Sequence, residues 1–168
     1  PNIAQFVTFA ENIVRTMPNT PAAIGAGITP YCTLHPLAAA DRTLVEQQLD
    51  AAGLHLPLPE DLMDAATAIS GCGPAFLFEF VAALRDAGTA AGLPPETALR
   101  LAGETVLGSA RLLARRQADP ETLRNQVTSP NGATQAGLRR MEALNFRDLV
   151  RQTVLAAKAR AEELSADS

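Results

Sequence analysis

The sequence has no tryptophan, one tyrosine and six phenylalanines, so aromatic residues make up only 4% of its 168 positions. Alanine and leucine dominate the 47% of residues that are hydrophobic. Strands favour aromatic and β-branched side chains, whereas alanine and leucine favour helices. The composition therefore predicts closely packed helices rather than a β-sandwich, in a chain long enough for one domain with a hydrophobic core, or slightly more.

An excess of positive charge is also absent. The chain has 14 lysines and arginines against 18 aspartates and glutamates, which gives a formal net charge of −4 and a pI near 5.2. This balance argues against a general nucleic-acid binder, which needs a basic surface. The longest apolar run, residues 74–84, contains Glu79 and is too short to cross a bilayer, and no signal peptide is recognisable. We therefore expect a soluble protein with no nucleic-acid or membrane partner.

Cysteine and histidine are too few and too scattered to build a disulfide framework or a metal site. Cys32 and Cys72 lie far apart and form no CxxC pair, so we expect both to be reduced, as in a cytosolic protein. His35 and His55 lack any metal-ligand spacing, and we expect no metal. No Ser-His-Asp or Cys-His set for nucleophilic catalysis can be assembled.

Two motifs that look functional have simpler explanations. Gly25-Ala26-Gly27 is half of a dinucleotide-binding fingerprint, but Pro30 stands where the third glycine belongs and no helix is expected to open there. Glu60, Asp61 and Asp64 fall in the first turn of an expected helix, where the helix dipole stabilises carboxylates. We interpret these acidic residues as structural rather than catalytic.

The N-terminal third of the chain predicts short strands, loops and one helix. The first residue is proline rather than methionine, which suggests a processed or trimmed chain, and residues 3–14 show no clear period. A strand ending near Val14 passes into a loop at residues 15–21, where two prolines exclude regular structure. We further expect strands over residues 24–31 and 54–58, and a helix over residues 36–52 that ends at a glycine.

Beyond residue 59 the spacing of apolar residues predicts helices throughout. The first runs to residue 69 and is interrupted by Gly71-Cys72-Gly73-Pro74, and Pro74 then occupies the first turn of the next helix. That helix, up to about residue 91, is apolar on nearly every side, so we expect it to be buried on all sides by its own core and by a partner subunit. The later helices are predicted over residues 94–117, from an Asp119-Pro120 cap, and on either side of Asn145, with a charged and polar C-terminus from Lys158.

The segment 126–134, with the sequence QVTSPNGAT, is the most informative part of the chain. Pro130-Asn131-Gly132 predicts a turn, and a helical pattern follows at once. A helix N-terminus offers unpaired N–H donors and partial positive charge, which suit a carboxylate or phosphate, and Thr128, Ser129 and Thr134 add hydroxyls. Without lysine or arginine, the turn suits a small anion better than nucleic acid. The alternative is an ordinary capped turn between two helices.

Three segments in this order resemble the pyrroline-5-carboxylate reductases: residues 17–21 (MPNTP), 62–76 (LMDAATAISGCGPAF) and 126–134. The match extends over nearly the whole chain from about Val14. It implies a mainly α fold: residues 1–58 as the C-terminal remnant of an NAD(P)-binding Rossmann domain, and residues 59–168 as an all-helical dimerisation and substrate-binding domain of the dehydrogenase C-terminal type. The Gly-rich first unit of the Rossmann domain is then missing from this chain.

The family's activity follows from the same resemblance. It implies an oxidoreductase that reduces 1-pyrroline-5-carboxylate to L-proline with NADPH or NADH, the last step of proline biosynthesis. Most of the cofactor site would lie outside this chain, so the isolated chain would be inactive. The implied partners are the small-molecule substrate and a second copy in a cytoplasmic homodimer, and larger rings of dimers are seen in the family.

The resemblance also implies site residues. Thr134 is the catalytic candidate, because its hydroxyl matches the position that bonds the ring nitrogen of the substrate and polarises the imine. The substrate carboxylate would be held by backbone N–H groups and the Ser129 hydroxyl of the turn. The substrate-binding set is Gln126, Val127, Thr128, Ser129, Asn131, Gly132, Ala133 and Thr134. The cofactor-binding set, at the nicotinamide end, is Met17, Asn19, Thr20, Pro21, Ser70 and Gly71.

The sequence departs from the family pattern at four positions. Cys72 replaces the middle serine of SGSGP, which weakens any hydrogen bond made there because a thiol is a poor donor. Asn131 replaces a glycine of PGG and is tolerable because asparagine adopts left-handed geometry. Asn125 and Gln117 stand where many members carry acidic residues, which puts any carboxylate–amine contact in doubt.

Two alternatives stay open on the sequence. The chain as given can be a non-catalytic helical dimerisation fragment, inactive without a cofactor domain. It can also belong to a related imine or β-hydroxyacid reductase with another substrate. A lysine on an active-site helix would favour the β-hydroxyacid class, but the only lysine is Lys158, near the C-terminus.

Overall fold

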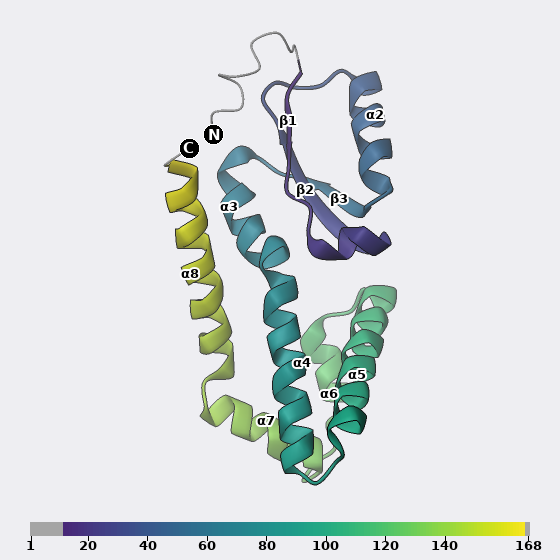
Figure 1. The fold of residues 1–168 in the computed structure, drawn as a ribbon, viewed down its shortest axis with the longest axis vertical. Helices are drawn as coiled ribbons and strands as arrows, with labels where there is room; N and C mark the ends of the chain where they lie inside the picture. Colours follow the sequence, from purple (N-terminus) through teal and green to yellow (C-terminus); the bar gives the residue numbers. More distant parts are fainter. Residues whose placement is uncertain (1–11, 167–168) are drawn as a thin grey trace. The chain divides into compact units, whose positions relative to one another are not determined.

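The computed structural model describes residues 12–166 (Figure 1). The chain forms two compact units: Pro1–Phe76 together with Arg151–Ser168, and Leu77–Val150. The expectations for the first residue and for most of residues 3–14 lie outside the described residues. The predicted division at residues 58 and 59 stays a prediction.

The first unit contains a three-stranded sheet of β1 (Val14–Thr16), β2 (Gly27–Thr33) and β3 (Gly53–Pro57), in the order β1-β2-β3. β1 pairs antiparallel with β2, whereas β2 pairs parallel with β3. A parallel pair needs a crossover connection, and α2 (Ala39–Asp50) supplies it. The short α/β segment expected from the sequence is confirmed, with bounds that differ by a few residues.

The loop predicted after β1 is in part a 3₁₀ helix, η1 (Thr20–Ile24). The expectation that two prolines exclude regular structure was wrong, because Pro21 lies in the first turn of η1, where its missing N–H costs nothing. Gly25 ends η1 in the left-handed region at φ 68°. β2 therefore begins three residues later than predicted.

The two glycines that open the parallel strands lie against each other. A Cβ on Gly53, which has φ +127°, would overlap the backbone of Gly27. A Cβ on Gly27 would come within 2.8 Å of the backbone of Ala22. These close approaches give the partial Gly25–Gly27 fingerprint a structural role at the start of the sheet.

The helical chain from residue 60 is nearly continuous. It passes from the 3₁₀ turn η2 (Glu60–Leu62) through α3 (Met63–Ala66) and the π-helix η3 (Thr67–Gly71) to α4 (Gly73–Ala90). The predicted break in the helix at residues 71–74 was therefore wrong, because the structure has one widened helical turn there instead. In this turn the N–H of Cys72 donates to the carbonyl of Thr67 over 2.9 Å. A π-turn of this kind is common at functional sites.

Because these segments join, residues Glu60–Ala90 are long and apolar enough to cross a membrane, with a mean hydropathy of 1.5 over 18 residues. The length argument made from residues 74–84 was therefore wrong. The core helix of an oligomer has the same length and composition, so these properties alone do not place it in a membrane. Only a small share of this stretch is buried within the single chain.

The second unit holds most of α4, then α5 (Pro95–Arg116), α6 (Pro120–Gln126), α7 (Ala133–Ala143) and the start of α8 (Phe146–Ala166). The predicted cap is confirmed, because an Asp119 carboxylate oxygen accepts the Thr122 N–H at 2.9 Å. Gln117 and Asn145, with φ 47° and 54°, stand where α5 and α7 end. The C-terminus predicted from Lys158 is helical to Ala166, so that expectation was wrong.

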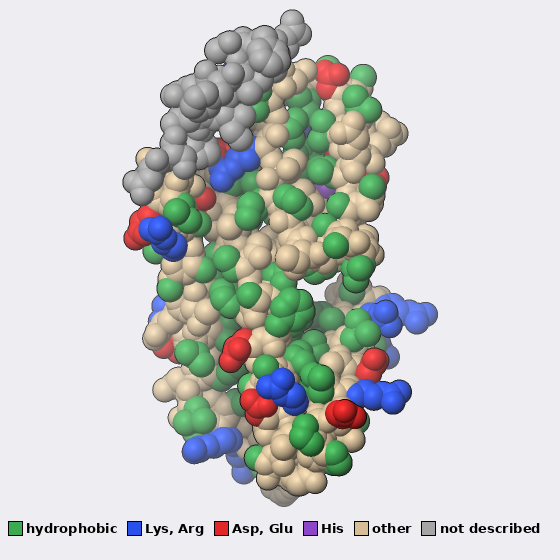
Figure 2. All heavy atoms as spheres, in the orientation of Figure 1, with side chains coloured by type: hydrophobic (Ala, Val, Ile, Leu, Met, Phe, Trp, Pro, Cys, Tyr) green, Lys and Arg blue, Asp and Glu red, His purple; other side chains and the backbone are tan. Residues whose placement is uncertain are grey.

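The helices of the second unit bury almost nothing within one chain. Ala98 and Ala102 are its only buried residues among those that the structure describes. Phe78 on α4 is 65% exposed, and hydrophobic side chains lie open on the surface (Figure 2). Burial of α4 by its own core is therefore not observed. An apolar helix left this open requires cover from another chain.

Candidate functional site

The segment 126–134 forms the predicted turn in the second unit. α6 ends at Gln126, and the Thr128 hydroxyl donates to the carbonyl of Arg124 over 2.7 Å. Asn131 takes the left-handed conformation at φ 59°, and Gly132 then caps α7. The prediction that this turn leads directly to a helix N-terminus is confirmed.

Gly132 is held closely by Ser129. The Gly132 N–H donates to the carbonyl of Ser129 over 3.1 Å, and a Cβ on Gly132 would overlap the Ser129 hydroxyl oxygen. Only glycine fits while that hydroxyl lies over position 132. The Ser129 hydroxyl therefore lies beside the start of α7.

The N–H donors of the turn fall into two groups. The Asn131 N–H donates to the side-chain oxygen of Gln135 over 2.9 Å, and the Gly132 N–H is used by Ser129. Ala133 and Thr134 open α7, and the cap residue Gly132 has no side chain to accept their N–H groups. Their N–H groups therefore have no partner within the turn, as is usual for the first turn of a helix.

Gln135 is a member of the turn that the sequence reasoning missed. It stands three residues after the cap, the position from which glutamine bonds back in a capping box, but the cap is Gly132 and the Ser/Thr-x-x-Glu/Gln pattern is absent, so no signal in the sequence points to it. Here it bonds the residue before the cap.

The Thr134 side chain is exposed and makes no hydrogen bond to any residue within 12–166. Gln126 and Val127 are exposed too, and Val127 is 68% accessible. The structure thus brings the predicted substrate-binding residues together on one open turn. The Thr134 hydroxyl remains free for a ligand.

The predicted cofactor residues lie in the first unit, on two segments. The Met17 N–H donates to the carbonyl of Pro30 over 2.9 Å as β1 ends. The Asn19 side-chain oxygen accepts the Ile28 N–H at 3.0 Å, so it fixes the loop to β2. Thr20 and Pro21 begin η1.

The second cofactor segment is the π-turn that carries Ser70 and Gly71. The Ser70 hydroxyl donates to the carbonyl of Ala66 over 2.9 Å. A Cβ on Gly71 would lie 3.2 Å from the Met17 methyl carbon and 3.4 Å from a methyl of Thr67. The two predicted cofactor segments are therefore in contact at Met17 and Gly71.

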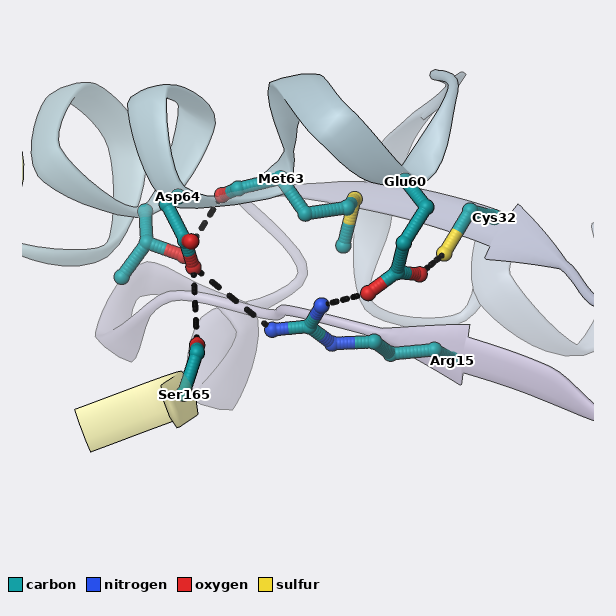
Figure 3. Close-up of polar contacts among 7 residues, drawn as sticks. Arg15, Cys32, Glu60, Met63, Asp64 and Ser165 are labelled. Carbon is teal, nitrogen blue, oxygen red and sulfur yellow. Dashed lines mark hydrogen bonds and ion pairs between the residues drawn. The ribbon is translucent and has the colours of Figure 1, made fainter. Parts of the chain in front are cut away.

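A polar network joins β1 to the start of the helical chain, the elements that directly precede these two segments (Figure 3). The Arg15 guanidinium pairs with Glu60 and lies 3.9 Å from an Asp64 oxygen. Asp64 also accepts the Ser165 hydroxyl at 3.1 Å, from the end of α8. The helix-dipole interpretation of Glu60 and Asp64 was incomplete, because nothing in the sequence pairs them with Arg15, which is 45 residues from Glu60 and farther from Asp64.

Cys32 extends this network from β2, with its sulfur 2.7 Å from a Glu60 oxygen. Burial and the hydrogen bond to Glu60 raise the pKa of the Cys32 thiol to about 11. Burial alone would raise the pKa of Glu60, but the bonds from Cys32 and Arg15 outweigh it and lower that pKa. The pair is therefore a neutral thiol donating to a carboxylate.

One hollow in the first unit contains none of the predicted site residues. It lies at the carboxyl end of β2, away from the Met17 loop. Its lining residues are Tyr31, Cys32, Thr33, Leu37, Arg42, Pro57, Leu58 and Pro59.

The pyrroline-5-carboxylate reductase dimerisation family matches residues 60–164, which include α4 to α7, nearly all of α8 and the whole turn at 126–134. The chain belongs to this family. The pyrroline-5-carboxylate reductase of Arabidopsis thaliana is 41% identical over 155 residues, which cover 92% of this chain and 56% of the relative. That of Pseudomonas aeruginosa is 41% identical over 154 residues, covering 91% and 56%.

Solved structures of pyrroline-5-carboxylate reductases are similar along almost the whole chain. The enzyme of Coxiella burnetii superposes with a TM-score of 0.91 at 37% identity, covering 96% of this chain and 60% of that one. The Plasmodium falciparum pyrroline carboxylate reductase, solved with NADP bound, gives 0.87 at 33% identity, covering 96% and 65%. The chain thus spans little more than half the length of these relatives.

Membership of the pyrroline-5-carboxylate reductase family confirms the predicted fold class: a helical dimerisation domain preceded by a short α/β segment. It also explains the apolar helix α4. A dimerisation domain implies a homo-oligomer.

Proposed function

We propose that a protein carrying this chain together with a cofactor domain reduces 1-pyrroline-5-carboxylate to L-proline with NADPH or NADH, the last step of proline biosynthesis. This chain supplies the substrate site and the dimer interface. The observation that carries the proposal is the turn at 126–134, where free N–H groups of α7 and a free Thr134 hydroxyl lie together. That pairing suits a substrate with a carboxylate beside an imine nitrogen.

The substrate carboxylate binds at the start of α7. The N–H groups of Ala133 and Thr134 are the available donors, and the partial positive charge of the helix end favours the anion. The Ser129 hydroxyl adds a donor from the side of Gly132. The Asn131 and Gly132 N–H groups join only if the carboxylate displaces their internal partners Gln135 and Ser129.

Thr134 acts on the ring nitrogen. As the imine carbon gains a hydride, the nitrogen gains a proton, and a hydroxyl backed by water can donate the hydrogen bond that favours this change. Because Thr134 is the second residue of α7, its hydroxyl and its own N–H belong to one rigid helix end. Most of the acceleration then comes from positioning and electrostatics.

The described residues fit the nicotinamide end of a cofactor. Gly71 has no side chain, and the Met17 methyl lies beside the space that a Cβ would fill, so the two segments that would hold the ring pack closely against each other. The bound reduced nicotinamide supplies the hydride. Met17, Asn19, Thr20, Pro21, Ser70 and Gly71 orient it, and the choice between NADP and NAD belongs to residues outside this chain.

We infer a cytoplasmic homodimer as the working form. The support is the open apolar surface of the second unit, together with a family defined by dimerisation. A purely structural role, as a dimerisation module without activity, is the second candidate. It is favoured by the same open helices and by the small share of a cofactor site that this chain carries.

A β-hydroxyacid reductase is disfavoured by the position of the one lysine. Lys158 lies on α8 and pairs with Glu162 one turn away on the same helix. An i,i+4 pair of this kind supports the helix, and residues 126–134 themselves include no lysine or arginine.

The experiment is steady-state oxidation of NADPH and of NADH by the protein with its cofactor domain, using pyrroline-5-carboxylate as substrate. Proline formed in equal amount to the cofactor oxidised supports the proposal. Cofactor binding without turnover of this imine contradicts it, and turnover of another cyclic imine assigns the related class instead.

A further inference from the structure

We propose that Arg15 is a positioning residue, which sets the contact between the Met17–Pro21 loop and the π-turn Thr67–Gly71 at the nicotinamide end. The inference rests on the proposed function, since it assigns those two segments to the cofactor. Arg15 touches neither substrate nor cofactor in this account. It acts through Glu60 and Asp64.

On the strand side, Arg15 is coupled tightly to the loop. It is the central residue of the three-residue strand β1 and lies opposite Cys32 of β2. Met17 follows two residues later, and its N–H is bonded to Pro30. A shift of the Arg15 backbone is therefore passed directly to the Met17 side chain.

On the helix side, the partners of Arg15 lie one turn apart. Glu60 opens the 3₁₀ turn and Asp64 lies in α3, so one guanidinium spans both elements. A planar guanidinium with several donors suits two carboxylates at once, whereas an ammonium is a single point charge. Arg15 thus fixes the start of the helical chain against β1.

The position of the π-turn depends on where the start of the helical chain is held. The Thr67 hydroxyl donates to the carbonyl of Met63 over 2.8 Å, which ties the first residue of the π-turn to the buried Met63 beside Asp64. Ser70 is tied in the same way to Ala66. Gly71 therefore has little freedom to move away from Met17 while Asp64 is held.

The low exposure of Arg15 and Asp64 supports a role for this ion pair in holding β1 and α3 in place. The Arg15 and Asp64 side chains are each only 23% exposed, whereas Glu60 is 58% exposed. Asp64 is also held by Ser165. We therefore expect Asp64 to be the more important anchor, although Glu60 is closer to the guanidinium.

The test uses the protein with its cofactor domain and compares Arg15→Met with Arg15→Lys, Asp64→Asn and a control, Arg160→Met. Arg160 pairs with Glu163 on the exposed face of α8, so the control removes an arginine ion pair that lies within one helix and outside the network. The readouts are the Kd for NADPH without substrate, separate KM values for NADPH and for the imine substrate, and the thermal midpoint.

Arg15→Met should raise the Kd and KM for NADPH about tenfold, with the KM for the imine within about twofold of wild type, since small misplacements at a reacting centre are costly. Arg15→Lys should recover part of the loss and Arg160→Met should show none. Asp64→Asn keeps the shape of the side chain and tests the same point if Arg15→Met does not fold.

An Arg15→Met or Asp64→Asn protein with a lowered thermal midpoint but unchanged Kd and KM for NADPH would overturn the inference. Equal losses for both substrates would do so too. Because the Kd is measured without the imine, it stays informative if the wild-type protein does not turn over this substrate, and failure of the proposed function is then seen separately.

Discussion

The methyl carbon of Met17 lies so close to Gly71 that a Cβ at position 71 would come within 3.2 Å of it. These residues are 54 positions apart in the chain, in two segments that the family resemblance assigns to the cofactor. Their contact supports the proposal that both segments meet at the nicotinamide end.

Gly71→Ala tests this contact. The added methyl must displace the Met17 side chain or widen the π-turn, so we expect the KM for NADPH to rise about fivefold to tenfold, within the range for small misplacements at a reacting centre. Gly73→Ala is the matched control, because a Cβ there meets no atom within 4 Å. Equal losses at both positions in initial-rate measurements would show that the Met17 contact is not the cause.

Gly132→Ala tests the anion site. The new side chain overlaps the Ser129 hydroxyl, so that hydroxyl must rotate away from the point where the carboxylate is proposed to bind. We expect the KM for the imine substrate to rise about tenfold or more, the value of one charge-assisted hydrogen bond, while the Kd for NADPH is unchanged. The double variant Gly132→Ala with Ser129→Gly has no such overlap. Comparing it with Gly132→Ala separates the effect of the overlap on the turn from the effect of losing the Ser129 hydroxyl. An unaltered KM would place the carboxylate elsewhere.

Thr134→Val should lower kcat by about one to two orders of magnitude, the usual range for one catalytic hydrogen bond. Valine preserves the shape of the side chain and removes the hydroxyl, whereas Thr134→Ser keeps the hydroxyl and should retain most activity. Pre-steady-state and steady-state rates of NADPH oxidation provide the comparison. Unchanged kinetics in Thr134→Val would remove this residue from the mechanism.

Phe78→Asp should weaken the homo-oligomer. Phe78 is 65% exposed on α4, and a charge at a buried apolar interface is costly. Leu44→Asp is the control, because Leu44 on α2 is 56% exposed but lies outside the segment matched by the dimerisation family. Light scattering should find a lower mass at low concentration for Phe78→Asp alone. Identical masses for both variants would exclude α4 from the interface.

Cys32 should react slowly with alkylating reagents up to mildly alkaline pH. Its pKa of about 11 in the folded chain, against 9.0 for the free thiol, lowers the thiolate fraction about a hundredfold at pH 8. Because the folded chain holds the thiol proton more tightly than the unfolded chain, the raised pKa stabilises the folded state. This contribution to the free energy of unfolding is complete below about pH 9 and is lost as the pH rises through 11. Iodoacetamide rates for the Cys72→Ser protein, folded and unfolded, measure the ratio, and equal rates would contradict the buried thiol–carboxylate pair.

Much of the fold could be predicted from local signals. The Asp119-Pro120 cap, the turn at Asn131-Gly132 and the end of a helix near Asn145 each depend on a few neighbouring residues, and each is confirmed. The errors have two sources. The π-turn at Thr67–Gly71 does not follow from the period of the apolar residues. The helix through Lys158 was missed although its ion pairs, Lys158–Glu162 and Arg160–Glu163, are local.

The site was predictable to a similar degree. The turn at 126–134 was found because all of its residues are contiguous, and only Gln135 beyond its end was missed. Arg15, Glu60 and Asp64 could not be joined from the sequence, because a strand and a helix bring them together across more than forty residues. The roles of Thr134 and of the cofactor residues stay predictions.

The most direct measurement is a crystal structure of the protein with its cofactor domain, bound to L-proline. We predict proline carboxylate oxygens within hydrogen-bond distance of the Ala133 and Thr134 N–H groups, and the Thr134 hydroxyl on the ring nitrogen. Proline bound away from residues 126–134, or bound there with its ring nitrogen turned away from Thr134, would contradict the account.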